Sequence, residues 1–243
     1  MEIRNVLFRE TIRLAATRTL PPVRLLSLLF GYQTSTAHAF RLENTRMIET
    51  ATAFTANNKI AGDYCEFGVF EGSTFTAAWH ATRRWALEGR RLHAFDGFQG
   101  LPEVDSADAG GPFVTGEFAA PRATFEKTLR RSDVDMKRVT VTEGMFDASL
   151  TPAAKSRIGL RSVNMAFIDC DLYASTVPVL DFLTDVLVDG AVLMFDDWNA
   201  FKNKPDKGEQ LAVKEWLAKN PSLKLHPYRD FHWCGQSFIL DRR

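Results

Sequence analysis

The stretch MAFIDCDLYASTVPVLDFLTDVLVDGAVLMF, residues Met165–Phe195, decides the fold class of this chain. It begins with the apolar run Met165–Ile168 and ends with the apolar run Ala191–Phe195, and neither run alternates with polar residues. Such runs are typical of strands buried on both faces, as in a parallel sheet. The residues between them predict a helix over about residues 176–187, with Gly190 supplying the left-handed cap that ends it. The stretch therefore predicts one strand–helix–strand unit of a parallel sheet.

The alternation of strands and helices continues on both sides of this unit. Further elements are predicted as strands at Asp63–Phe67, Arg91–Phe95 and Arg138–Thr142 and as helices at about residues 73–87 and 209–219. The last two strands, Leu223–Tyr228 and Gln236–Leu240, are joined by a short loop, which permits an antiparallel pair but not a parallel crossover. The sequence therefore predicts an α/β fold with five parallel strands and a terminal antiparallel hairpin.

The beginning of the chain has a different pattern. We assign residues 1–60 to an N-terminal helical extension and residues 61–243 to the sheet domain, with helices expected at residues 1–20 and 36–57. Arginines interrupt every apolar run before residue 30, so no run approaches the ~20 residues of a membrane span, and a signal-peptide core is also missing. A helix that covers the domain or a subunit partner is expected, and a basic helix at a membrane surface is the alternative.

Composition narrows the class of protein. Of the 243 residues, 45% are hydrophobic and 25% are charged, which excludes a disordered or fibrous chain. The 30 basic and 30 acidic residues balance, which argues against a general nucleic-acid-binding protein. The three cysteines lack CxxC spacing and are too few for a disulfide framework, so we expect a cytoplasmic protein.

Ligands of an open parallel sheet bind beyond the carboxyl ends of its strands. The first strand runs into Glu66–Thr74 (EFGVFEGST). There Gly68 permits a tight turn, Glu66 offers a carboxylate to a cationic ligand group, and Ser73 opens a helix whose N-terminus favours anions. This is not the dinucleotide pattern GxGxxG, because Phe70 and Ser73 stand where that pattern needs glycine. A purely structural strand–helix turn is the alternative.

The next two strand ends offer further candidate cofactor-binding residues. Asp96 follows the second strand, where a carboxylate can accept hydrogen bonds from ribose hydroxyls, although it can also form a turn before Gly97. Phe146 follows the third strand, where its ring could wall an adenine or simply pack in the core.

The carboxylates after the fourth and fifth strands are the most informative residues of the chain. Asp169 ends the fourth strand, and Asp196 and Asp197 end the fifth. If these strands are neighbours, the three carboxylates converge and repel one another, with no Lys or Arg among them in the sequence. Mg²⁺ would resolve this repulsion, whereas the lack of a His/Cys cluster argues against zinc. Helix capping by one or two of these residues is the alternative.

Five blocks of the sequence resemble, in the same order, those of the macrocin-type O-methyltransferases. The blocks are EFGVFEGST, HAFDGFQGLP, EGMFDASL, FIDCDLYAST and VLMFDDWNAF. These enzymes are metal-dependent sugar methyltransferases of antibiotic pathways that use S-adenosylmethionine, and they include the mycinamicin and novobiocin enzymes. The resemblance covers roughly residues 60–240. It implies a class I methyltransferase, Rossmann-like fold with a seven-stranded, mostly parallel sheet.

The resemblance also implies roles for the strand-end residues. Glu66, Gly68 and Ser73 would line the methionine part of the cofactor, Asp96 would hold its ribose, Phe146 would flank its adenine, Asp169 would border it, and Asp169, Asp196 and Asp197 would bind Mg²⁺. The metal would take two oxygens of a vicinal diol on a small-molecule or glycosylated substrate. Metal coordination lowers the pKa of a hydroxyl, and a carboxylate can then remove its proton. Asp169 is the candidate for ligand and base together, although Asp171 or a bound water could share the work.

Further expectations concern the rim of the site, the partners and the competing functions. The irregular insertion at residues 101–118 is predicted to be a lid or a substrate loop, with a plain surface insertion as the alternative. His232 lies just before the last strand and could reach the substrate rim. Leu172 stands where the similar catechol-type methyltransferases have a lysine, so a lysine base of that kind is not expected. A homo-oligomer joined through the N-terminal helices is expected. A nicotinamide-dependent oxidoreductase and a non-catalytic scaffold are the competing functions.

Overall fold

The computed structural model describes residues 36–243, with side chains from residue 39 onward, so the predicted helix over residues 1–20 lies outside it. Glu43–Arg243 form one compact unit, and the predicted division at residue 60 stays a prediction.

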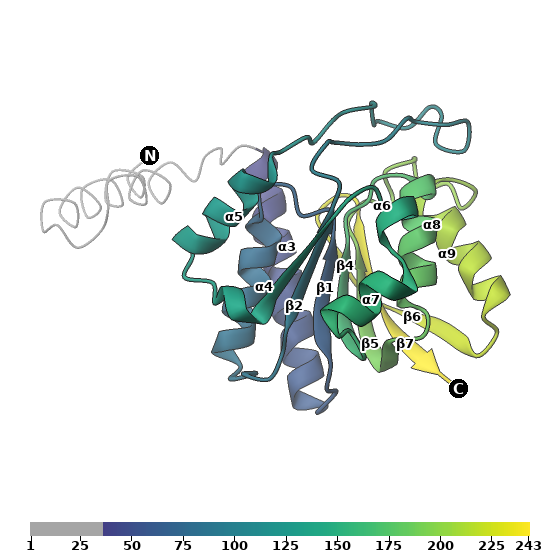
Figure 1. The fold of residues 1–243 in the computed structure, drawn as a ribbon. Coiled ribbons are helices and arrows are strands. Elements are labelled where there is room, and N and C mark those ends of the chain that lie inside the picture. Colours follow the sequence, from purple (N-terminus) through teal and green to yellow (C-terminus); the bar gives the residue numbers. More distant parts are fainter. Residues whose placement is uncertain (1–35) are drawn as a thin grey trace, which may run out of the picture. The chain divides into compact units, whose positions relative to one another are not determined.

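The unit is built on one seven-stranded sheet of order β3-β2-β1-β4-β5-β7-β6 (Figure 1). Strands β1 to β5 are parallel, and β7 runs antiparallel to both β5 and β6. The strands are β1 (Asp63–Phe67), β2 (Leu92–Asp96), β3 (Val139–Glu143), β4 (Val163–Ile168), β5 (Leu187–Phe195), β6 (Leu223–Phe231) and β7 (Gly235–Arg242). The predicted class I methyltransferase architecture is confirmed.

Helices cover both faces of this sheet (Figure 1). One face is covered by α3 (Thr36–Asn57, here from Glu43 onward), α4 (Ser73–Arg84) and α5 (Arg122–Arg131), and the other by α7 (Pro152–Ile158), α8 (Tyr173–Leu183) and α9 (Gly208–Lys219). Buried strand residues alternate between the two cores, so that Tyr64 packs with the first set of helices and Cys65 with the second. The apolar strands without alternation are thus explained by burial on both faces.

The largest difference from the prediction concerns the segment before β5. Helix α8 ends at Leu183, and Gly190 lies inside β5, so the prediction that Gly190 caps this helix is wrong. Its φ of 75° coincides with a register irregularity between β4 and β5, where glycine tolerates the left-handed backbone. The helix α5 and the short elements η1 (Met136–Arg138), α6 (Phe146–Ser149) and α7 were not predicted.

The strand register aligns the ends of four strands in one row. Phe95, Phe67, Ile168 and Phe195 are paired across β2, β1, β4 and β5. The next residue of each strand therefore falls in a single row, which consists of Asp96, Gly68, Asp169 and Asp196. Since β1 leads by crossovers to β2 on one side and β4 lies on the other, this row crosses the switch point of the sheet, where open α/β sheets bind their ligands.

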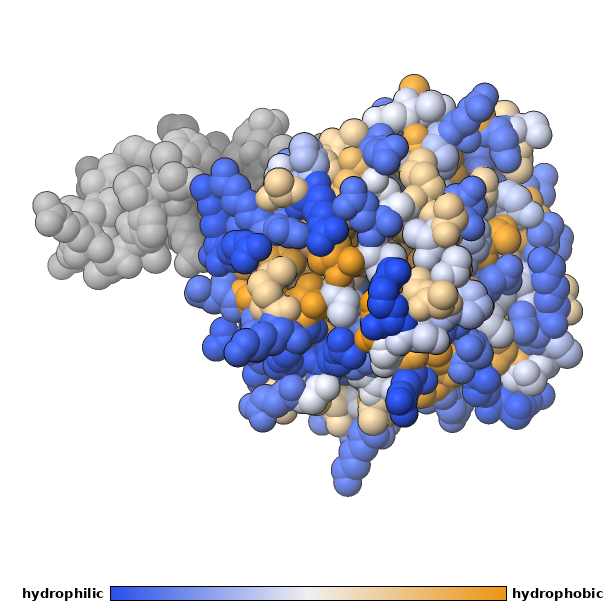
Figure 2. Space-filling view, viewed as in Figure 1, coloured by the Kyte–Doolittle hydropathy of each residue, from blue (hydrophilic) through white to orange (hydrophobic). Residues whose placement is uncertain are grey.

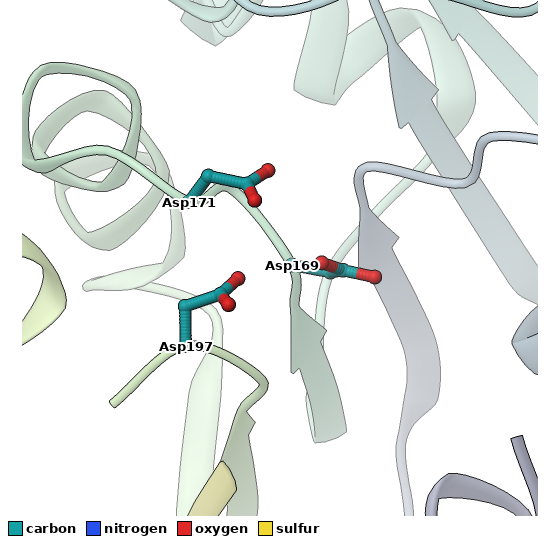
Figure 3. A group of neighbouring side chains, drawn as sticks. All are labelled: Asp169, Asp171 and Asp197. Carbon is teal, nitrogen blue, oxygen red and sulfur yellow. The ribbon is translucent and has the colours of Figure 1, made fainter. Parts of the chain in front are cut away.

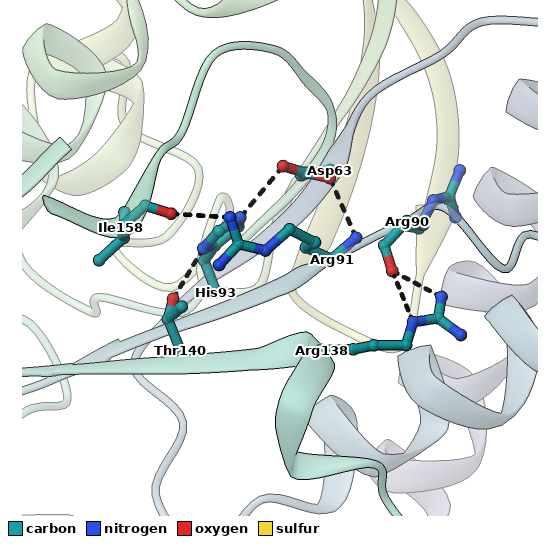
Figure 4. A network of polar contacts seen from close by, with 7 residues as sticks. All are labelled: Asp63, Arg90, Arg91, His93, Arg138, Thr140 and Ile158. Carbon is teal, nitrogen blue, oxygen red and sulfur yellow. Dashed lines mark hydrogen bonds and ion pairs between the residues drawn. The ribbon is translucent and has the colours of Figure 1, made fainter. Parts of the chain in front are cut away.

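The opposite, amino end of the sheet carries a separate polar network that is structural (Figure 4). Asp63 accepts a hydrogen bond from the backbone N–H of Arg91 at 3.0 Å and lies 3.2 Å from His93 Nε2. The other ring nitrogen of His93 lies 2.7 Å from Thr140 Oγ1, so this buried ring links β1, β2 and β3. Nearby, the Arg138 guanidinium donates to the Arg90 carbonyl oxygen. These contacts satisfy polar groups that would be costly to bury alone.

The surface of the described region is mixed. On the face shown in Figure 2, hydrophobic residues emerge in small groups among hydrophilic ones. None of the helices within residues 36–243 is long and apolar enough to cross a membrane.

Candidate functional site

The turn after β1 brings the backbone of two neighbouring strands unusually close together. Gly68 has a φ of 84°, and a Cβ placed on it would lie 1.9 Å from the carbonyl oxygen of Asp169. Gly72, with a φ of 87°, then precedes Ser73, the exposed first residue of α4. Glycine is therefore required at Gly68 by both backbone conformation and space. The turn leads directly into a helix N-terminus, which favours an anionic ligand group.

Asp96 organises this same turn. One of its carboxylate oxygens accepts hydrogen bonds from the backbone N–H groups of Val69, at 2.7 Å, and Phe70, at 3.0 Å. The other accepts from the N–H of Phe98 at 2.6 Å. Phe70 and Phe98 both have left-handed backbone, with φ of 43° and 52°. The carboxylate thus holds two strained turns at the carboxyl edge, and its role toward a ribose stays a prediction.

Glu66 is fully buried on β1, just below the row of strand ends. Its two carboxylate oxygens accept hydrogen bonds from Tyr64 Oη and Thr74 Oγ1, both at 2.5 Å. Burial raises the pKa of Glu66 from 4.5 to about 8, and the charges of Asp196 and Asp96 act in the same direction, although the two hydrogen bonds oppose the shift. The carboxyl group of Glu66 therefore holds its proton near neutral pH in the absence of a cationic partner.

Replacing Glu66 by glutamine is expected to flatten the pH dependence of stability. Between pH 4.5 and about 8 the unfolded chain has lost the Glu66 proton and the folded chain keeps it. Folding therefore binds a proton, and the free energy of unfolding of the wild type falls as pH rises through this window, by at most about 1.4 kcal/mol per pH unit from this group. Urea unfolding of both proteins at pH 5, 6, 7 and 8, without ligands, measures the difference. Glu71→Gln, at an exposed position of the same turn, is the control, and parallel curves for Glu66→Gln and wild type would contradict the prediction.

Three carboxylates converge beyond β4 and β5 (Figure 3). Asp169, Asp171 and Asp197 each offer a carboxylate oxygen, and these oxygens lie within 4.8 Å of one another. We refer to these three residues as the acidic cluster. Asp171 has a left-handed backbone, with a φ of 62°, which turns the chain after β4 so that its carboxylate lies beside that of Asp197. From the sequence, Asp171 is predicted only as a possible base; the signal for its place here is its spacing of two residues from Asp169.

The electrostatics of the acidic cluster are unfavourable without a cation. Burial, followed by the charges of neighbouring carboxylates, raises the pKa of Asp169 and of Asp197 well above the ordinary value and raises that of Asp171 to about 7. Behind the cluster, Glu209 is 1% exposed and accepts a hydrogen bond from the N–H of Asp197 at 3.1 Å. Asp197 Oδ2 and Glu209 Oε1 are buried and have no hydrogen-bond partner within the described residues. Burying such oxygens without a partner costs free energy of folding unless a proton or a cation binds to them.

Asp196, the other predicted metal ligand, is not among the oxygens of the acidic cluster. Its Oδ1 lies 3.1 Å from Nε2 of His232, whose side chain is 3% exposed. Asp196 and Asp169 nevertheless follow the paired residues Phe195 and Ile168 of neighbouring strands, and the charge of Asp196 contributes to the raised pKa of Asp169. Asp196 as a metal ligand stays a prediction. His232 thus lies beside a residue of the strand-end row, and its contact with a substrate stays a prediction.

Phe146 begins α6 at the end of β3 and is half-buried. Its ring meets that of Phe67 edge to face, with 6.1 Å between centroids. The ring therefore lies beside the carboxyl ends of β1 and β3, and contact with an adenine stays a prediction.

The insertion at residues 101–118 runs above the carboxyl edge of the sheet (Figure 1). Asp108 is 1% exposed, and it accepts hydrogen bonds from the first backbone N–H groups of α8, those of Tyr173 at 2.9 Å and Ala174 at 3.4 Å. Phe113 packs against Phe201 with 5.8 Å between centroids. The insertion is thus fastened over the helix that follows the acidic cluster, and a helix N-terminus is capped by a distant loop.

Comparisons with known proteins identify the family and similar folds. The family described as macrocin-O-methyltransferase (TylF) matches residues 34–216. A comparison with curated protein sequences finds no significant match.

Among solved structures, the O-methyltransferase NovP is similar with a TM-score of 0.68 and 21% identity, over 83% of this chain and 80% of that one. The calicheamicin methyltransferase CalS11 is similar with a TM-score of 0.69 and 21% identity, over 97% of this chain and 91% of that one. The apo structure of CalS11, described as a TDP-rhamnose 3'-O-methyltransferase, is similar with a TM-score of 0.60 and 18% identity, over 97% of this chain and 93% of that one. TomG from Streptomyces achromogenes, an O-methyltransferase in complex with SAM, is similar with a TM-score of 0.53 and 15% identity, over 80% of this chain and 78% of that one. These likenesses agree on the fold.

Proposed function

Because the chain belongs to the macrocin-O-methyltransferase family, and is thus an O-methyltransferase, we propose that it methylates a sugar hydroxyl with S-adenosylmethionine and Mg²⁺. The observation that carries the proposal is the acidic cluster, whose oxygens lie within 4.8 Å of one another at the carboxyl edge of the sheet. A dehydrogenase has no need of such a cluster, and a non-catalytic scaffold would keep its repulsion without benefit.

The cofactor would bind beyond the carboxyl ends of β1, β2 and β3. Glu66, Gly68 and Ser73 would border its methionine part, Asp96 its ribose, Phe146 its adenine, and Asp169 the end nearest the acidic cluster. The buried carboxyl group of Glu66 suits the cationic amino group, since a positive charge nearby favours its ionised form. The SAM complex of TomG, on a similar fold, supports this cofactor.

The residues present fit a hard divalent cation. Magnesium prefers carboxylate oxygens and keeps further positions for water or substrate oxygens. The buried Asp197 Oδ2, which lacks a partner among the described residues, is a ready ligand atom. Asp169, Asp171 and Asp197 would hold the ion, with Asp196 beside them. When bound, the ion lowers the pKa of a coordinated hydroxyl and holds it near the cofactor.

The remaining chemistry falls to the carboxylates and to positioning. The substrate hydroxyl oxygen forms a bond to the methyl carbon as the bond from that carbon to the sulfonium sulfur breaks, which leaves S-adenosylhomocysteine. The hydroxyl proton must pass to a base within hydrogen-bond reach. Because Asp171 stands beside Asp169, the acidic cluster offers a second carboxylate for the proton. Holding both reactants in line would supply much of the rate.

The name of CalS11 as a TDP-rhamnose methyltransferase supports a sugar as the acceptor. We propose the insertion at residues 101–118 as the substrate loop. At its end Phe118 is 56% exposed, and its ring meets that of the exposed Phe70 edge to face at 6.3 Å. These two rings lie between the loop and the turn after β1, where they can contact an acceptor. We also propose, from the sequence, a cytoplasmic location and a homo-oligomeric state.

Calorimetric titration of purified, metal-stripped protein tests the proposed function. We expect S-adenosylmethionine and S-adenosylhomocysteine to bind, NAD not to bind, and Mg²⁺ to bind at a site that Asp196→Asn loses. Binding of NAD in place of the adenosyl ligands would favour an oxidoreductase. Binding of none of these ligands would favour a scaffold.

A further inference from the structure

We infer that His232 is a positioning residue that fixes the carboxylate of Asp196 for metal binding. The inference rests on the proposed Mg²⁺ site and adds to it a residue from the distant β6–β7 turn. It follows from the hydrogen bonds of the His232 ring.

The backbone around His232 determines which ring nitrogen carries the hydrogen. Nδ1 lies 3.1 Å from the backbone nitrogen of Cys234 and 3.3 Å from that of Gly235. Both backbone groups are N–H donors, so Nδ1 must accept. In the neutral imidazole the hydrogen then lies on Nε2, which donates to Asp196 Oδ1 at 3.1 Å. An Nε2 that carries a hydrogen is a donor to the carboxylate and not itself a metal ligand.

The turn that carries His232 is built to hold this position. His232 has a left-handed backbone, with a φ of 42°, and its ring packs edge-on against Phe231 with 4.8 Å between centroids. Asn199, two residues after Asp197, donates from both its backbone and side-chain nitrogens to the Cys234 carbonyl oxygen, at 3.0 and 3.1 Å. The turn and the loop after β5 are therefore fixed to each other. Strained backbone of this kind persists where the surroundings over-determine it, and it often marks a functional site.

The two carboxylate oxygens of Asp196 would therefore have separate roles. Oδ1 accepts from His232, which leaves Oδ2 for a cation beside the acidic cluster. A carboxylate held in one orientation loses less conformational freedom on metal binding, and residues that orient metal ligands in this way typically contribute 10- to 100-fold in metal affinity.

His232→Asn is the specific test of this role. Asparagine tolerates a left-handed backbone, and its side-chain oxygen can replace Nδ1 as acceptor for the two backbone N–H groups. Its side chain is too short to reach Asp196, so the variant removes the N–H that donates to this carboxylate. We expect the melting temperature to stay close to that of the wild type, the affinity for S-adenosylmethionine to be unchanged, and the Mg²⁺ affinity, measured by calorimetry on metal-stripped protein, to fall by about 10- to 100-fold.

Three further variants complete the experiment. His226→Asn is the matched control, because His226 pairs with Asp241 at 3.4 Å on the same hairpin but is half exposed and away from the acidic cluster; we expect wild-type Mg²⁺ affinity. His232→Gln restores a side-chain N–H long enough to reach Asp196 and should recover much of the affinity. Wild-type Mg²⁺ affinity in a folded His232→Asn would overturn the inference alone. A wild type that binds no Mg²⁺ would overturn the proposed metal site and the inference with it. If His232→Asn did not fold, equal Mg²⁺ affinities of His232→Gln and a folded His232→Ala would overturn the inference, and a lower affinity of His232→Ala would support it.

Discussion

Gly68→Ala is expected to lower the free energy of unfolding by about 3 kcal/mol or more. A left-handed backbone costs an alanine ~1–2 kcal/mol, and forcing atoms into a filled space typically costs ~1–3 kcal/mol more. The added Cβ would lie 1.9 Å from the Asp169 carbonyl oxygen, which belongs to backbone and cannot rotate away. Relief requires β1 and β4 to separate at their ends, where the N–H of Asp169 donates to the Phe67 carbonyl oxygen at 2.9 Å. Urea unfolding at neutral pH measures the change.

Gly110→Ala separates the two contributions. Gly110 has nearly the same φ, 81°, but no atom lies within 4 Å of the position of an added Cβ. It should therefore show only the backbone cost of about 1–2 kcal/mol. Equal losses in the two variants would mean that the contact with Asp169 contributes nothing, and that the strand ends can part without cost.

The sequence was sufficient to predict the sheet and the residues at its carboxyl edge. Strands β4 and β5 contain apolar runs without alternation, and each of β2, β4 and β5 reaches an aspartate at the same level of the register. Because parallel strands end at one edge, Asp96, Asp169 and Asp196 could be assigned to a common row before their distances were known. Gly68 completes the row where a side chain would not fit.

Contacts between distant segments could not be read in this way. His232 meets Asp196 across 36 positions because β7 returns antiparallel beside β5, and nothing in the local sequence fixes that register. Asp108 caps α8 from the insertion, although helix caps are normally sought next to the helix. Asp171 joins the acidic cluster through a left-handed backbone that aspartate adopts only occasionally. Gly190 was misassigned because a glycine in an irregular strand and one at a helix end look alike in sequence.

The removal of one charge from the acidic cluster should have opposite effects on catalysis and on stability. Asp169→Asn keeps the size of the side chain but removes a carboxylate from the proposed metal site. Loss of a metal-bound carboxylate forfeits several kcal/mol of transition-state stabilisation, so we expect Mg²⁺-dependent turnover to fall by at least about 100-fold. The affinity for S-adenosylmethionine should stay nearly intact, because the turn after β1 and the residues beyond β2 and β3 are unchanged.

The same substitution should stabilise the metal-free protein. Burial and the charges of Asp196, Asp171, Glu66 and Glu209 all raise the pKa of Asp169, so its ionised form opposes folding at neutral pH. A neutral amide removes this cost, and single stabilising substitutions commonly contribute about 0.5–2 kcal/mol. We therefore expect metal-free Asp169→Asn to melt at a higher temperature than metal-free wild type. Added Mg²⁺ should raise the melting temperature of the wild type and leave that of the variant unchanged.

Asp185→Asn is the control for a lost carboxylate outside the site, since Asp185 is 70% exposed and pairs with Lys155 at the surface. It should keep wild-type turnover and respond to Mg²⁺ as the wild type does. Wild-type turnover in Asp169→Asn would show that the catalytic assignment of Asp169 is wrong. Loss of turnover with lower stability in the metal-free state would instead mean that Asp169 supports the fold. Asp169 is identified as a cation-binding carboxylate that lowers the stability of the metal-free fold only by three results together. These are lost turnover, retained cofactor binding and higher metal-free stability of Asp169→Asn.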